Sequence, residues 1–224
     1  MGNDIVFVYD FDGVIVDSYD CLPKVYREIA RLLNIENTEL FVKAMIMFED
    51  VADYMGLWDR RKWWKIIFSI DDEKAEEISR LYWGLRIKYT KVFDDAKTVL
   101  TELKKRGYVL YMVTGCDDTI ENKIKRIEAS GVKDFFEEIL VYGRNSNYKD
   151  IVQAINVLKK KLSDKTLYYV DDKPSNLRKL VGLNIRLVHY MYKPHVFPEA
   201  LSWTEKTPDG VIEIKDHREI LNII

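Results

Sequence analysis

The sequence predicts an α/β protein in which a doubly wound, mostly parallel sheet is interrupted by an all-helical insertion. Three observations support this fold class. Short apolar runs alternate with amphipathic helical patterns from Val92 onward, as in repeated βαβ units. A similar apolar run stands near the start of the chain, at residues 5–9. Between these parts, residues 19–91 carry apolar side chains at helical spacing, without strand-like alternation.

Each element of the predicted core follows from a local pattern. The expected strands are short apolar runs at residues 5–9, 108–113, 139–141, 167–170 and 185–188. The expected helices are amphipathic stretches at residues 96–106, 119–130, 148–162 and 175–180. Gly107 and Gly131 follow two of these helices and are typical helix stops. An irregular segment with Pro194, Pro198 and Pro208 precedes a last strand at 211–214 and a short helix from His217, which we expect at one sheet edge.

The insertion is predicted to form a separate helical domain. Leu22, Val25 and Ile29 recur at helical spacing, as do several apolar residues between 75 and 85. We therefore assign residues 1–18 and 92–224 to the core and residues 19–91 to the insertion. The insertion contains several tryptophans, for which packing in a helical core is a simpler interpretation than stacking on a substrate. These are Trp58, Trp63, Trp64 and Trp83.

Composition limits the partners and the compartment. Charged residues make up 32% of the 224 residues, but they are spread along the chain and the formal net charge is only −2. This balance favours neither nucleic acid nor an acidic membrane surface as a partner. Cys21 and Cys116 are too few for a disulfide framework, and their separation is unlike a zinc site. With no basic leader and no apolar run of roughly 20 residues, we expect a cytoplasmic protein.

The first chemical motif directly follows the first predicted strand. Asp10 and Asp12 are two residues apart and Gly13 comes next. Open α/β sheets bind ligands at the carboxyl ends of their strands, and glycine permits backbone geometries that other residues resist. One carboxylate can attack a substrate while the other moves protons. The alternatives are an aspartate pair in a turn, or a cation site without catalysis.

Two further motifs also stand at the ends of predicted strands. Thr114 and Gly115 lead from a strand toward a helix, whose free N–H groups favour an anion, although a simple helix cap gives the same pattern. Asp171 and Asp172 follow another apolar strand. Adjacent carboxylates repel each other unless a positive charge holds them, and Mg²⁺ prefers such oxygen ligands.

The order and spacing of these motifs resemble the haloacid dehalogenase superfamily of phosphatases, through nearly the whole chain. The resemblance implies a Rossmann-like core with a helical cap between the first and second motifs, as in the branch of phosphoglycolate phosphatase and β-phosphoglucomutase. Residues 19–91 stand at the place of that cap. The interval from Gly115 to Lys149 leaves no room for a second cap.

The resemblance also implies roles for individual residues. Asp10 would be the nucleophile and Asp12 the general acid and base, while Thr114 and Gly115 would bind phosphate. Lys149 would be the phosphate-binding lysine because it opens the helix before the last motif. Lys123 and Lys125 are the alternatives for that role.

A metal site is implied by the same resemblance. Its cofactor would be Mg²⁺, with Mn²⁺ as a substitute. The ligands would be the Asp10 carboxylate, the Asp12 main-chain carbonyl and Asp172. Asp171 and Asn176 would lie beside the metal; Asn176 stands where many relatives carry a further acidic residue.

The function expected from these assignments is Mg²⁺-dependent hydrolysis of a small phosphate monoester through phospho-Asp10. A sugar phosphomutase of the same superfamily is the nearest alternative, and a non-catalytic phosphate-binding module is another. A dehalogenase does not fit, because those relatives lack the second aspartate that Asp12 provides. The sequence identifies neither the substrate nor the oligomeric state. Polar residues of the insertion cannot be told from surface residues; they are Glu49, Arg60, Arg61 and Lys62.

Overall fold

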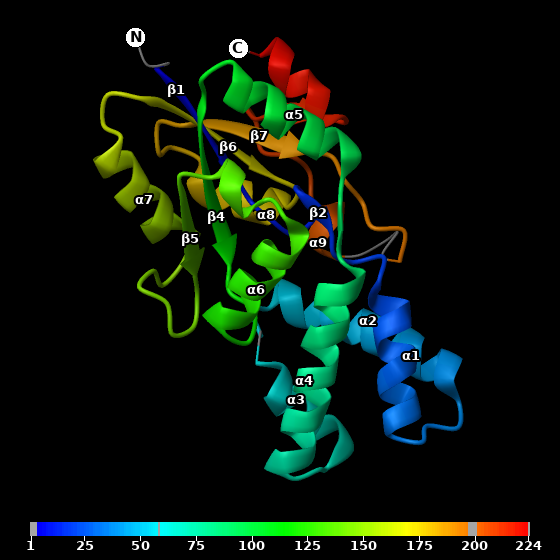
Figure 1. Cartoon of the computed structure of the whole chain (residues 1–224). Coiled ribbons are helices and arrows are strands. Elements are labelled where there is room, and N and C mark those ends of the chain that lie inside the picture. The colour runs from blue at the N-terminus through cyan, green and yellow to red at the C-terminus, as the bar shows by residue number, and fades with distance from the viewer. Residues whose placement is uncertain (1–3, 58, 197–200, 224) are drawn as a thin grey trace.

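A parallel six-stranded sheet forms the core of the protein (Figure 1). The computed structural model describes residues 4–57, 59–196 and 201–223. The strand order is β5-β4-β1-β6-β7-β8, and every neighbouring pair is parallel. The strands are β1 (Ile5–Tyr9), β4 (Val109–Gly115), β5 (Glu138–Tyr142), β6 (Thr166–Asp171), β7 (Arg186–Tyr190) and β8 (Ile212–Ile214).

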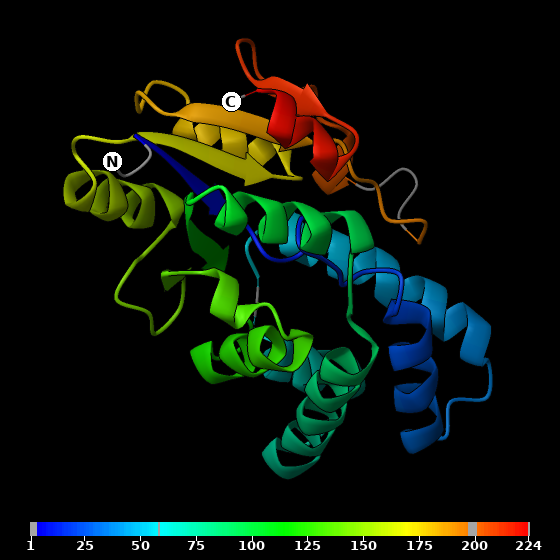
Figure 2. The ribbon, with the colours of Figure 1, turned by 45° about the horizontal axis from the view of Figure 1, so that its top comes forward.

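Alternating side chains bury both faces of the sheet. Val6 and Val8 of β1 pack in one apolar cluster, whereas Phe7 and Tyr9 pack in another on the opposite face. Helices α7 (Ile151–Lys161) and α8 (Pro174–Leu180) cover the first face. The second face is covered by α5 (Asp94–Lys105), α6 (Ile120–Ser130) and the 3₁₀ helices η1 (Lys133–Phe135) and η2 (His217–Asn222). Figure 2 shows η2, in red, beside α5. This doubly wound arrangement confirms the predicted fold class.

Local sequence signals explain where the core helices begin and end. The side chain of Thr119 accepts a hydrogen bond from Asn122 N at the start of α6, and Asp150 does the same for Gln153 N at the start of α7. Gly131 ends α6 in the left-handed conformation that glycine adopts readily. Pro174 stands in the first turn of α8, where its missing N–H costs no helical hydrogen bond.

The insertion forms a group of helices below the carboxyl ends of the strands in Figure 1. Its helices are α1 (Leu22–Leu32), α2 (Thr38–Tyr54), α3 (Arg60–Phe68) and α4 (Asp72–Tyr89). The short strands β2 (Val16–Asp17) and β3 (Lys91–Val92) pair antiparallel at its base. We call α1–α4 the helical insertion. Helices α1 and α4 lie where the apolar spacing predicted helices, whereas α2 and α3 were expected only as part of an all-helical insertion. The division into domains at residues 18 and 92 stays a prediction.

Aromatic side chains fill the core of the helical insertion. Trp64 is fully buried and stacks on Phe68, and Tyr26 and Tyr82 pack near it. Trp63 and Trp83 are also buried, as the packing interpretation requires, but Trp83 also lines a cavity, so for Trp83 that interpretation stays a prediction. Trp58 lies outside the described residues.

Several predicted boundaries shift, and some shifts matter for the site. The strand predicted at 108–113 runs to Gly115, so Thr114 and Gly115 belong to β4. The helix predicted at 148–162 begins only at Ile151, because Asp150 caps it, so the prediction that Lys149 opens this helix is wrong. The proline-containing segment after β7 holds a short helix, α9 (Leu201–Thr204). Pro198 lies outside the described part of the chain. Among the described residues, no helix is long and apolar enough to cross a membrane.

A buried histidine ties the C-terminus to the loop that follows Asp12. The His217 ring lies between a carboxylate and a carbonyl, with Nδ1 3.0 Å from Asp95 Oδ2 and Nε2 2.7 Å from Val14 O. Burial alone would raise the pKa of Asp95, but the hydrogen bonds and charge of His217 lower it to about 2. The tie therefore holds the backbone two residues beyond Asp12 in place.

We predict that Asp95→Asn lowers the free energy of unfolding by about 1–2 kcal/mol at neutral pH, after allowance for partial exposure of the carboxylate. The pKa of Asp95 is lower in the folded state than in the unfolded chain. Its stabilisation is therefore present above about pH 4 and is lost as the pH falls toward 2. Urea unfolding of both proteins from pH 3 to 7 should show the difference shrinking in acid. A difference that grows in acid would contradict this account.

Candidate active site

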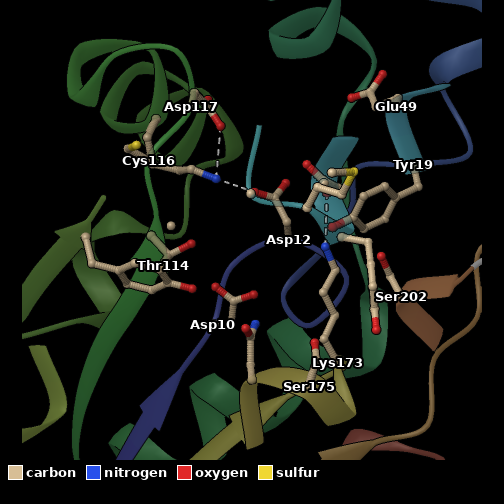
Figure 3. Close-up of a pocket in the computed structure, with 18 of the residues that line it drawn as sticks. Asp10, Asp12, Tyr19, Glu49, Thr114, Cys116, Asp117, Lys173, Ser175 and Ser202 are labelled. Carbon is tan, nitrogen blue, oxygen red and sulfur yellow. Dashed lines mark hydrogen bonds and ion pairs between the residues drawn. The ribbon is translucent and has the colours of Figure 1, made fainter. Parts of the chain in front are cut away.

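The three predicted motifs meet at one edge of the sheet. Asp10 follows β1, Thr114 lies near the end of β4, and Asp171 ends β6 with Asp172 next. These strands are neighbours in the order β4-β1-β6 and run in parallel, so their carboxyl ends converge. The four side chains are buried. Figure 3 shows Asp10, Asp12 and Thr114 close together at a cavity of about 480 Å³.

Asp10 lies in a crowded acidic environment. Burial, followed by the nearby charges of Asp171 and Asp12, raises its pKa to about 7. Lys123 and a hydrogen bond from the Thr114 side chain act in the opposite direction. Placing a further negative charge beside Asp10 is therefore energetically unfavourable unless a cation compensates for it.

The adjacent acids Asp171 and Asp172 have different surroundings. Both oxygens of Asp171 accept hydrogen bonds, from Tyr169 Oη at 2.7 Å, Lys173 N at 2.8 Å and Asn176 Nδ2 at 3.2 Å. Asn176 thus orients Asp171 through its amide. Asp172 accepts a hydrogen bond on Oδ2, while its buried Oδ1 has no partner among the described residues. Burial, with the charge of Asp171, raises the pKa of Asp172 well above its ordinary value.

This donor set fits a hard divalent cation. Carboxylate oxygens of Asp10, Asp171 and Asp172 lie within 4.8 Å of one another. The unpartnered Oδ1 of Asp172 is the kind of buried acceptor that normally has a partner. A cation such as Mg²⁺ would satisfy it and relieve the mutual repulsion of the acids.

Gly13 makes room for this acidic cluster. Its φ is +76°, a conformation that other residues resist, and a Cβ atom there would lie 2.6 Å from Cγ of Asp172. The glycine of the first motif is therefore required both for the turn after Asp12 and for the close approach of Asp172.

Asp12 forms a buried ion-pair cluster on the other side of the cavity. Its carboxylate pairs with Lys123 and Arg126 of α6, and both cations also pair with Asp117, at 3.1 and 3.0 Å. Burial alone would raise the pKa of Asp12, but the charges of Arg126 and Lys123 hold this pKa well below its usual range. Figure 3 shows Asp12 and Asp117 joined through this cluster.

The structure does not bring Lys149 to the cavity. Lys149 is exposed beside the start of α7 and lines a separate shallow depression with Asp150 and Gln153. Lys125 is exposed as well, whereas the Lys123 side chain is only 4% exposed and lines the cavity. Lys123 was expected as an alternative for the phosphate-binding lysine, but sequence reasoning missed the buried Arg126. Arg126 could have been found from its spacing of three residues from Lys123, which places both side chains on the same face of α6.

The helical insertion supplies a second group of buried charges. Glu49 pairs with Arg60 at 2.7 Å and with Arg86 at 3.3 Å, and it accepts hydrogen bonds from Tyr26 and Tyr82. Glu49, Arg60 and Arg86 line the cavity. Arg61 and Lys62 are exposed, so the structure separates the four polar candidates that the sequence could not separate. Sequence reasoning missed Arg86, which no motif marked.

Polar contacts join the helical insertion to the loops that carry the motifs. Asp118, just beyond β4, accepts hydrogen bonds from Arg60 N at 3.1 Å and Trp83 Nε1 at 2.8 Å. Lys173, just beyond Asp172, donates to Asp53 of α2 at 3.1 Å. The insertion therefore contacts the chain immediately after two of the three motifs.

Comparison with known proteins identifies the family. The sequence profile of the haloacid dehalogenase-like hydrolases matches residues 7–188 of this chain. The match includes the three motifs and the helical insertion. The chain therefore belongs to the haloacid dehalogenase superfamily, as its motifs indicated. No curated protein sequence matches this chain.

Solved structures share the fold over nearly the whole chain at low sequence identity. A predicted phosphoglycolate phosphatase from Haemophilus somnus 129pt is 16% identical (TM-score 0.67; 99% of this chain and 98% of that one). The hydrolase YfnB from Bacillus subtilis, solved with magnesium, is 15% identical (TM-score 0.67; 97% of each chain). A haloacid dehalogenase-like hydrolase from Burkholderia xenovorans LB400 is 18% identical (TM-score 0.69; 99% and 96%).

We predict that Gly13→Ala reduces Mn²⁺ affinity at least tenfold, because its methyl group would displace the Asp172 carboxylate. Gly107→Ala is the matched control: Gly107 has a φ of +80°, but its added methyl group would meet no atom within 4 Å. Backbone strain should cost both variants about 1–2 kcal/mol of stability, measured by urea unfolding. Electron paramagnetic resonance of free Mn²⁺ measures the affinities. Equal affinities in the two variants would contradict the prediction.

Proposed function

We propose that this protein is a Mg²⁺-dependent phosphohydrolase that acts on a small phosphate monoester through phospho-Asp10. The observation that carries this proposal is that Asp10 and Thr114 line one cavity, while carboxylate oxygens of Asp171 and Asp172 lie within 4.8 Å of that of Asp10. The family is one of hydrolases, and two of the similar structures are described as a predicted phosphoglycolate phosphatase and a magnesium-bound hydrolase. We expect a small phosphorylated metabolite as the substrate, with no nucleic acid or membrane partner.

The acidic residues would first bind the metal. Asp10, Asp172 and the main-chain carbonyl of Asp12 would hold Mg²⁺, or Mn²⁺ in its place, with Asp171 and Asn176 supporting them. The cation supplies the charge neutralisation that a carboxylate and a phosphate dianion need before they can approach each other. Asp171 suits a supporting role because its oxygens already accept hydrogen bonds.

Asp10 would then attack the phosphorus atom, and the bond from phosphorus to the ester oxygen would break. The Thr114 hydroxyl, which hydrogen-bonds Asp10, lies within reach of a phosphoryl group on that carboxylate. Together with the Gly115 N–H it would hold the phosphoryl oxygens while charge redistributes. Water would hydrolyse phospho-Asp10 in a second step.

Asp12 would donate the proton to the leaving oxygen and later accept one from water. In the structure its carboxylate is paired with Lys123 and Arg126. An incoming phosphate dianion competes for the same cations, so binding of the substrate would loosen these ion pairs and make a proton on Asp12 less costly. We therefore assign the phosphate-binding role to Lys123 in place of Lys149.

We predict that Asp10→Asn abolishes hydrolysis of p-nitrophenyl phosphate, since an amide cannot act as the anionic nucleophile. Acid-quenched wild-type protein should carry a hydroxylamine-sensitive phosphate at Asp10, detected by mass spectrometry, and the variant should not. Excess chelator should stop turnover. A variant with a tenth of the wild-type rate would place the nucleophile elsewhere.

The same experiments distinguish the alternative functions. A phosphomutase would transfer phosphate to a sugar without releasing it, and a binding module would show no phosphoprotein.

We predict that Lys123→Met lowers kcat/KM for p-nitrophenyl phosphate by about 100-fold or more, as expected when a buried charge near the phosphoryl group is removed. Lys149→Met should stay within about twofold of wild type, because Lys149 is exposed outside the cavity. Lys125→Met is the control on the same helix. A large loss in Lys149→Met with little loss in Lys123→Met would reverse the assignment.

A further inference from the structure

The proposed metal ligand Asp172 is held by a residue from the far end of the chain. Trp203 of α9 donates a hydrogen bond from Nε1 to Asp172 Oδ2 at 2.6 Å. This bond is buried, since Asp172 is fully buried and Trp203 is 5% exposed. Gly13 lies against the same carboxylate. The indole thus fixes one oxygen of Asp172 and leaves Oδ1, which has no partner among the described residues, available for a cation.

Helix α9 is itself fastened to the helical insertion. Asp50 of α2 accepts hydrogen bonds from Leu201 N at 2.9 Å and from the Ser202 hydroxyl at 3.2 Å. Asp50 is buried. The Trp203 ring also belongs to the apolar cluster of the insertion, where it meets Tyr19 edge to face at 4.8 Å between ring centroids.

A second route joins the same helix to Asp172. Asp53 lies three residues after Asp50, on the same side of α2, and pairs with Lys173, the residue that follows Asp172. The Lys173 ammonium lies 5.0 Å from the centroid of the Trp203 ring and 5.4 Å from that of Tyr19. Figure 3 shows Lys173 beside Tyr19 and Ser202, and all three residues line the cavity.

We propose that Trp203 is a positioning residue for Asp172 and that α9 couples the position of the helical insertion relative to the core to divalent-cation binding. The inference rests on the proposed function, because it requires Asp172 to be a metal ligand. If Asp50 and Trp203 hold the Asp172 carboxylate in its cation-binding rotamer, displacement of the insertion frees that carboxylate and weakens the site. Coupling of this kind is reciprocal, so a bound cation must in turn stabilise the contact of α9 with α2.

The test compares the Mn²⁺ affinities of the full-length wild-type protein and its variants, by electron paramagnetic resonance. Trp203→Phe keeps the packing of the ring but removes the N–H group, and we expect an affinity at least tenfold weaker, in the range typical for loss of a group that orients a metal ligand. Trp64→Phe is the matched control, since Trp64 is also buried but its Nε1 has no partner among the residues described. We expect its affinity to stay within twofold of wild type.

A second variant tests the connection to the insertion without changing the indole. Asp50→Ala should weaken Mn²⁺ binding severalfold, although Asp50 does not touch Asp172. Hydrogen exchange supplies the reciprocal readout: Mg²⁺ should slow exchange in α2 and α9 of the wild type and have less effect in Trp203→Phe. Near-ultraviolet circular dichroism establishes that each variant is folded.

Two outcomes separate this inference from the proposed function. If Asp172→Asn loses Mn²⁺ binding while Trp203→Phe and Asp50→Ala keep wild-type affinity, Asp172 is a ligand and the role of Trp203 is overturned. If Asp172→Asn binds Mn²⁺ as well as wild type, the metal assignment fails and the inference fails with it. Weaker binding in both Trp203→Phe and Asp50→Ala, with normal binding in Trp64→Phe, supports the coupling.

Discussion

The repulsion among the buried carboxyl groups of Asp10, Asp171 and Asp172 is the constraint on which the rest of the site depends. The parallel strands β1 and β6 bring these groups together, and burial makes each charge costly. Several neighbouring features then follow as ways of holding the acids in one arrangement. Hydrogen-bond donors occupy Asp171, the Trp203 indole fixes one oxygen of Asp172, and the missing side chain of Gly13 leaves room for it.

Most of the cations that line the cavity form ion pairs with acids outside the cluster of Asp10, Asp171 and Asp172. Lys123 and Arg126 face Asp12 and Asp117, and the paired arginines of the helical insertion face Glu49. Buried ion pairs contribute little net stability, because desolvation cancels much of the attraction. These ion pairs instead fix the positions of the long cationic side chains that line the cavity. The acids would serve as temporary partners that a substrate can replace.

Sequence patterns predicted the sheet and the acidic cluster because both depend on local signals. Apolar runs mark the strands, and the residues that follow parallel strands lie at one edge of the sheet, so Asp10 and Asp172 could be assigned to the same edge. Their place in one site was implied by the family resemblance. The burial of a helical side chain is a tertiary property. Neighbours such as Arg60 and Arg61 look alike in sequence, yet one is buried and the other exposed. Lys149 was expected to open the helix before the last motif, and its exposure is likewise a tertiary property. Trp203 lay in a proline-containing segment without a periodic pattern, so nothing local connected it to Asp172.

Polar contacts join the helical insertion to the loops that carry the acidic site. Asp118, Lys173 and α9 belong to the core sequence, and each hydrogen-bonds to the insertion. Asp118 and Lys173 lie within a few residues of a proposed phosphate or metal ligand, and α9 contacts Asp172 through Trp203. A cap attached only by its β2 and β3 connections could open without disturbing the acids. Here opening must also break polar contacts that orient the loops after β4 and β6. Because these contacts join the insertion to the loops after β4 and β6, separating the two parts would also disturb the arrangement of charges around the cavity, where burial strengthens electrostatic interactions.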